Sequence, residues 1–238
     1  MLKRKVKNYI LEAHAAARAA KAWLKTRSLA DGDYTLPYRV YHSTLQPTLS
    51  ITFRDEVDQF GEVEALRWSR DACGIAAAKS AITTLCRLSD PGFELPSISA
   101  LARDQVAQKG YVEKIGWAHL ALAKLARKYG LSAANYVNER PIALCDRLLA
   151  EEIPIVSVTL YFRGGIPVGK DADSNLRSKG GHLVVLRGFR WKSRHCVGFY
   201  VDDSQNTTLK EGEDSEEFVE IPAFEASYSG KVIYIRNP

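Results

Sequence analysis

The chain has 238 residues, of which 46% are hydrophobic and 26% are charged, and its formal net charge is +5. This length and composition predict one folded domain of moderate size with an appendage, and they exclude a disordered or fibrous protein. No run of apolar residues is long enough to span a bilayer, so we expect a soluble protein. The four cysteines form no CxxC motif and follow no secretory signal, which favours free thiols in the cytoplasm.

The positive charge is concentrated at the N-terminus. Residues 1–27 carry eight Lys or Arg and the single acid Glu12, a net charge of +7 that leaves −2 for the rest of the chain. A helix of about 22 residues is predicted here, because small or apolar residues recur at spacings of three and four. These residues are Val6, Ile10, Ala13, Ala17, Ala20 and Leu24. We expect the basic face to be solvated, with an acidic partner, a second copy of the chain or a transit-peptide role as alternatives, and nucleic acid is not expected.

Residues 31–60 follow as a connecting arm. Residues 31–33 have the composition of a turn, and residues 38–41 and 49–53 have the pattern of short strands. We expect the arm to lie on the surface of the main domain. The predicted organisation is therefore residues 1–60 as an N-terminal helix and arm, and residues 61–238 as the main domain.

The first half of the main domain is predicted to be helical. After Cys73, apolar residues recur with the period of a helix face, at Ile75, Ala78, Ile82 and Leu85. Three further helices are predicted from their end signals. They run from a Ser97 cap to about Gln108, from Gly116 or Trp117 to Tyr129 before a left-handed Gly130, and from Pro141 to Ala150.

The second half is predicted to consist of strands. The candidate segments are rich in β-branched and aromatic residues and cover residues 153–160, 182–189, 197–201, 218–221 and 231–235. Residues 162–180, with their glycines and polar side chains, are predicted to form a mobile loop. Because helices come first and strands second, we expect an α+β fold with an antiparallel sheet packed on a helical half.

Cys73 is the candidate nucleophile. It follows polar and charged residues, precedes Gly74 and opens a predicted helix, where unpaired backbone N–H groups and the helix dipole favour a thiolate. We interpret Gly74 as leaving room for a group that approaches the sulfur. The alternative is a structural cysteine at a helix end. The other cysteines, Cys86, Cys145 and Cys196, lie in apolar segments typical of packed thiols.

A cysteine nucleophile needs a base, and histidine titrates in the right range. Of the five histidines, only His182 follows a double glycine and opens a predicted strand. Asp202 and Asp203 end the next strand, and an antiparallel pair of strands would return them beside His182. We expect Asp203 to orient the imidazole, with Asp202 as the alternative. The competing interpretations are structural: His182 would be a histidine packed in the core, and the two aspartates would belong to a turn.

These motifs together resemble a family, the papain-like cysteine peptidases that process double-glycine leader peptides, including their stand-alone relatives. The segments that carry the resemblance are residues 71–74, 180–189 and 200–204, with weaker similarity at 122–131 and 148–156. The resemblance covers about residues 60–235. It implies a papain-like fold, a peptide or protein substrate and a triad of Cys73, His182 and Asp203, and no cofactor or metal is expected.

One departure from the family pattern concerns the oxyanion. Such enzymes usually place a Gln a few residues before the cysteine, but residues 67–72 contain none, and the nearest upstream are Gln46 and Gln59. The remaining candidate donors are Ser69, Arg70, a protonated Asp71 and backbone N–H groups. Since loss of one oxyanion donor typically slows turnover about 100- to 1000-fold, a weak or inactive enzyme is an alternative.

The sequence therefore predicts a cysteine hydrolase, and specifically a peptidase. In this hypothesis Cys73 attacks a carbonyl, His182 acts as base and then acid, Asp203 fixes the imidazole tautomer, and water resolves the thioester. The 162–180 loop is expected to border the cleft as a lid. Two alternatives stay open: acyl transfer to an amine by the same triad, and a non-catalytic binding module that uses the basic N-terminal helix.

Overall fold

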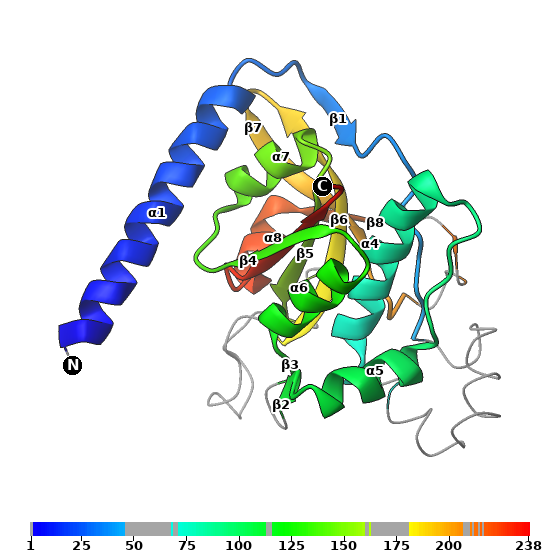
Figure 1. The fold of residues 1–238 in the computed structure, drawn as a ribbon. Helices are drawn as coiled ribbons and strands as arrows, with labels where there is room; N and C mark the ends of the chain where they lie inside the picture. Colours follow the sequence, from blue (N-terminus) through cyan, green and yellow to red (C-terminus); the bar gives the residue numbers. More distant parts are fainter. Residues whose placement is uncertain are drawn as a thin grey trace, which may run out of the picture.

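The structure is a computed structural model that describes residues 2–45, 68, 71–112, 116–159, 162, 181–206, 210, 212–213, 215 and 217–238. A seven-stranded antiparallel sheet organises these residues (Figure 1). The strand order is β4-β9-β5-β6-β7-β8, with β1 also paired to β6. The strands are β1 (Gly32–Thr35), β4 (Ser132–Tyr136), β5 (Ile153–Val158), β6 (His182–Lys192), β7 (His195–Asp202), β8 (Glu217–Glu220) and β9 (Val232–Arg236).

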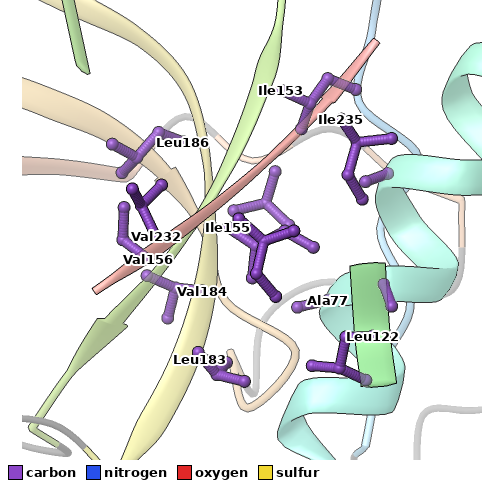
Figure 2. Packing of buried hydrophobic residues seen from close by; sticks show 14 of the residues in the cluster. Ala77, Leu122, Ile153, Ile155, Val156, Leu183, Val184, Leu186, Val232 and Ile235 are labelled. Carbon is purple, nitrogen blue, oxygen red and sulfur yellow. The ribbon is translucent and has the colours of Figure 1, made fainter. Parts of the chain in front are cut away.

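The centre of the sheet is apolar on both faces. All six residues of β5 are buried, and the first five residues of β6 are buried as well. Figure 2 shows Ile155 and Leu183 on the side of Ala77 and Leu122, while Val156 and Val184 point to the opposite side. Because successive side chains alternate between the two faces, a strand buried on both faces is a continuous apolar run. This explains why these two strands are visible in the sequence.

Helices pack around this sheet (Figure 1). Their bounds are α1 (Leu2–Thr26), α4 (Cys73–Ser89), α5 (Ile98–Ala107), α6 (His119–Lys128), α7 (Pro141–Leu149) and α8 (Ile221–Ser227). Helix α4 contacts β5, β6 and β9, and every residue from Gly74 to Leu85 is buried. A helix that is buried on all sides is a core element, so α4 holds a fixed position against the sheet. Across the described residues, no helix combines the length and apolar character that a membrane crossing needs.

The predicted α+β class is confirmed, as are several end signals. Ser97 caps α5 through a hydrogen bond from the Ala100 N–H to its Oγ at 3.2 Å, α7 begins at Pro141, and Gly130 has a φ of 81°. The predicted start of the third helix was wrong. Gly116–Trp117 is not helical but forms strand β3, which pairs with β2 (Tyr111–Val112), so α6 begins only at His119.

Helix α1 is confirmed, but its predicted packing face was wrong. Buried residues of the helix are Ala15, Ala19, Ala22 and Thr26. The helix contacts α7, and Figure 1 shows that its C-terminal half lies nearest the body. The larger side chains lie on the other side: Tyr9 is 77% exposed, Ile10 46%, Trp23 50% and Leu24 56%. Two alanine stripes run along this helix, and periodicity alone does not say which one allows closer approach to α7.

The arm differs from its prediction in two ways. Gly32 belongs to strand β1 rather than to a turn, and residues 38–41 form no strand. The arm was also expected on the surface, but Val40, His42 and Leu45 are buried in the core. The segment 49–53 and the boundary between residues 60 and 61 lie outside the described residues, so the domain division stays a prediction.

Strand β1 approaches β6 so closely that the register depends on Gly188. A Cβ at this position would lie 2.6 Å from the Tyr34 carbonyl oxygen and 2.8 Å from the Thr35 Cα. Gly188→Ala should therefore lower the free energy of unfolding by about 1–3 kcal/mol, since backbone atoms must move apart. The measurement is chemical denaturation. Gly32→Ala in the same strand pair is the matched control, because nothing lies within 4 Å of its Cβ; equal losses in both variants would contradict this account.

Candidate active site

Cys73 lies at the position that the sequence predicts, the first residue of α4. Ala72 is the N-cap and makes no side-chain capping bond, and the Cys73 side chain is partly exposed. The apolar positions that follow, Ile75, Ala78 and Ile82, are fully buried. The buried residues therefore hold the helix in place, while Cys73 at its start still reaches solvent.

Gly74 has a different role from the one that we inferred. A Cβ on Gly74 would lie 2.9 Å from both Leu183 Cδ1 and Trp117 Cδ1. The space beside its backbone is thus filled by side chains of β6 and β3, and not left for an approaching group. Gly74 lets α4 pack closely against the strand that begins at His182, which sets the distance between the two elements.

His182 is the first residue of β6, and it is 1% exposed. The preceding Gly181 has a φ of 107°, a conformation that favours glycine, so a glycine is required where the chain enters the strand. The Nε2–H of His182 donates to Asp203 Oδ1 at 2.7 Å. The ring of Phe162 lies over the imidazole, with 6.2 Å between the ring centroids, and shields it from water.

The electrostatics favour a charged His182. Burial opposes the imidazolium, but hydrogen bonds to Asp203 and Cys73 and the charges of these two groups outweigh it and raise the pKa of His182 to about 9. With Nε2 bound to Asp203, Nδ1 is the ring nitrogen left for the thiol. His182 is therefore hydrogen-bonded to Asp203 at 2.7 Å, and Cys73 is close enough to contribute to its raised pKa.

The two consecutive acids are used differently. Asp203 reaches His182 and also accepts a hydrogen bond from the Gln205 N–H at 3.0 Å. Asp202 instead accepts a bond from Nδ1 of His42, at 2.6 Å. We did not anticipate this second pair. His42 directly follows the segment 38–41, which is irregular in the structure, and no local signal marks its distant partner.

The segment before Cys73 is described only in part. Trp68 is buried and its ring contacts those of Tyr111 and Trp117, and the Trp117 Nε1–H donates to the Asp71 carbonyl oxygen at 2.9 Å. Asp71 itself is exposed. The other candidate oxyanion donors lie outside the described residues and so stay predictions: Ser69, Arg70, Gln46 and Gln59. The predicted lid at 162–180 is also undescribed apart from Phe162.

The remaining histidines have other surroundings. His14 and His195 are exposed, and burial, with a smaller contribution from the charge of Lys231, lowers the pKa of His119 to about 4. Within the described ranges no group of three or more His, Cys, Asp or Glu side chains is arranged to hold a metal ion.

The structure thus places a cysteine at the start of a buried helix, and it places a hydrogen-bonded histidine and aspartate at the start of β6 and directly after β7. The family model described as the Peptidase_C39 like family matches residues 57–231, and the chain belongs to this family. Its class is therefore that of the cysteine peptidases, as the sequence motifs implied. No curated protein matches the chain.

Three solved structures are similar to the chain. The double-glycine motif protease of an AMS/PCAT transporter, solved with its leader peptide, is 20% identical over 70% of this chain and 84% of that chain, with a TM-score of 0.41. The peptidase domain of Streptococcus ComA, a bi-functional ABC transporter, is 14% identical over 71% and 93%, with a TM-score of 0.44. A C39-like peptidase from Bacillus anthracis is 14% identical over 70% and 89%, with a TM-score of 0.44.

The His182–Asp203 pair predicts a specific pH dependence of stability. Because the pKa of His182 is raised from 6.5 to about 9, its protonation stabilises the folded state fully below pH 6.5, and this contribution disappears as the pH rises through about 9. Asp203→Asn keeps an acceptor but loses the charge. We expect it to lower the free energy of unfolding by about 1–3 kcal/mol near pH 6 and by less near pH 9.5.

Denaturation at both pH values checks this expectation. Asp33→Asn is the control, because Asp33 pairs with Arg190 at the exposed surface and should have little effect at either pH. A loss in Asp203→Asn that is the same at pH 6 and at pH 9.5 would contradict the assignment.

Proposed function

We propose that this chain is a cysteine hydrolase that cleaves peptide bonds, with Cys73 as nucleophile, His182 as base and acid, and Asp203 as the residue that orients His182. The observation that carries the proposal is the buried hydrogen bond between His182 and Asp203, together with the influence of Cys73 on the pKa of His182. A charged imidazole close to Cys73 is the group that can return a proton to the leaving amine. Membership of a peptidase family supports a peptide or protein as the substrate.

The chemistry follows from these positions. The Cys73 sulfur attacks the carbonyl carbon, and a C–S bond forms as the carbonyl becomes tetrahedral. The C–N bond then breaks, and the amine leaves with the proton that His182 carried. A water molecule next gives a proton to His182 and attacks the thioester, which releases the acid and restores the thiolate. Throughout, Asp203 keeps the proton on Nε2 and directs Nδ1 to the reacting atoms.

The oxyanion would be held first by the backbone N–H of Cys73, at the positive end of α4. A second donor would be one of the candidates that the sequence predicts before Cys73. A cytoplasmic location is also proposed, and it is supported by the state of the four cysteines. All four lie within the described residues and none of them forms a disulfide there.

Selective alkylation tests the nucleophile. Cys86 lies on the same helix and is also partly exposed, but burial and, to a lesser extent, the charge of Asp90 raise its pKa, so it is the internal control. With limiting iodoacetamide at pH 7, we expect Cys73 to react at least about 10-fold faster than Cys86, as measured by peptide mapping. Labelling at equal rates at both cysteines would overturn the proposal.

Peptide cleavage provides the second arm of the same test. Cys73→Ala should lower turnover of a peptide library by about 1000-fold or more, while Cys86→Ala should leave it unchanged. Addition of an amine acceptor separates hydrolysis from acyl transfer, because the transferase alternative predicts an amide product.

The non-catalytic alternative is favoured by one observation. The exposed face of α1 carries the large side chains Tyr9, Trp23 and Leu24, which are suited to an apolar contact with a partner, and the basic residues of the helix are suited to acidic groups around that contact. Uniform labelling of the cysteines, together with loss of partner binding in Trp23→Ser, is the result that this alternative predicts.

A further inference from the structure

A second His–Asp pair lies next to the one described above. His42 and Asp202 are both almost completely buried, with exposed fractions of 0% and 2%. The Nδ1–H of His42 donates to Asp202 Oδ1 at 2.6 Å, which is as short as the bond between His182 and Asp203. A buried carboxylate needs such a donor, because burial of an uncompensated charge is costly.

The arm that carries His42 is bound on one side to the end of β7 and to the segment that follows it. The Leu45 N–H donates to the Ser204 carbonyl oxygen at 2.8 Å, and the Gly212 N–H donates to the His42 carbonyl oxygen at 2.8 Å. Residues 42 and 45 are therefore hydrogen-bonded to the chain on both sides of Asp203. Strand β7 ends at Asp202, so the described residues 203–206 are not held by strand hydrogen bonds.

On its other side the arm is bound to α4, the helix that begins at Cys73. The Ser43 N–H donates to Ser80 Oγ at 3.1 Å, and the Tyr41 N–H donates to Thr84 Oγ1 at 2.8 Å. Both hydroxyl groups are buried within the helical core. Residues 41–45 thus link the helix of the candidate nucleophile to the segment of the candidate orienting acid.

We propose that His42 is a positioning residue for the active site, which holds Asp202 and thereby fixes the backbone from which Asp203 reaches His182. This inference rests on the proposed function. His42 touches neither substrate nor reacting atoms in this account. Its role is to set the direction of the neighbouring carboxylate, and small errors of position in such groups are known to have large effects on rate.

In this proposal, the residues that support the active site extend beyond the region that the family model matches. The family model begins at residue 57, whereas His42 and its arm precede it. The arm therefore acts on the site from outside the matched region. Leu36, whose N–H donates to the Arg187 carbonyl oxygen at 2.8 Å, fastens the arm to β6 as well.

Three variants test the role of His42. His42→Ala removes the donor, His42→Asn places an amide N–H where Nδ1 was, and Val40→Ala is the control, since Val40 is buried in the same arm but bonds to neither acid through its side chain. One readout is the iodoacetamide rate at Cys73. The other is the pKa of His182 from NMR titration, which a merely structural loss would not move.

We expect His42→Ala to slow alkylation of Cys73 by about 10- to 100-fold and to lower the pKa of His182, because Asp203 no longer points at Nε2. His42→Asn should restore most of both values, and Val40→Ala should change neither, even if it unfolds at a lower denaturant concentration. If His42→Ala does not fold, His42→Leu in its place keeps the side-chain volume and carries the same expectation.

The outcomes separate this proposal from the one on which it rests. If Cys73 of the wild-type chain reacts no faster than Cys86, the proposed function fails, and the titration of His182 still decides the role of His42. An unchanged pKa of His182 in folded His42→Ala would overturn the positioning role. An equal fall of the pKa of His182 in Val40→Ala would overturn it as well.

Discussion

The buried hydrogen bond between His182 and Asp203 is the interaction on which the account of this protein depends. A histidine that is 1% exposed would ordinarily be neutral, because burial penalises its charged form. The carboxylate at 2.7 Å and the neighbouring Cys73 reverse this preference, so the pKa of His182 is raised to about 9. The same bond that makes a charged group tolerable in the core also prepares it to exchange a proton with a thiol.

Several features of the fold serve to keep that bond in place. Gly74 lets α4 pack against Leu183, one residue beyond His182, and Gly181 supplies the backbone conformation that turns the chain into β6. Phe162 covers the imidazole. These contacts come from segments far apart in the sequence, so the site is a product of the packing of the whole sheet and of its central helix.

The sequence predicted the elements that have strong local signals. Cys73 at a helix start, His182 after two glycines and Asp203 at the end of a strand could each be found, and the structure brings them together. His42 could not be found, because its partner is 160 residues away and no local signal in its arm points to that partner. The packing face of α1 was missed for a related reason: two stripes of small residues look alike until α7 is beside one of them. Gly116–Trp117 pairs with Tyr111–Val112 instead of extending α6, which is tertiary context overriding a local pattern.

The central claim is that His182 carries a proton at neutral pH because Asp203 and Cys73 hold it there. NMR titration of the His182 ring in the intact protein tests this claim most directly. The account predicts a midpoint near pH 9, well above the ordinary value of 6.5, with the proton on Nε2 throughout. A midpoint at or below 6.5 would show that burial outweighs both partners, and it would contradict the account.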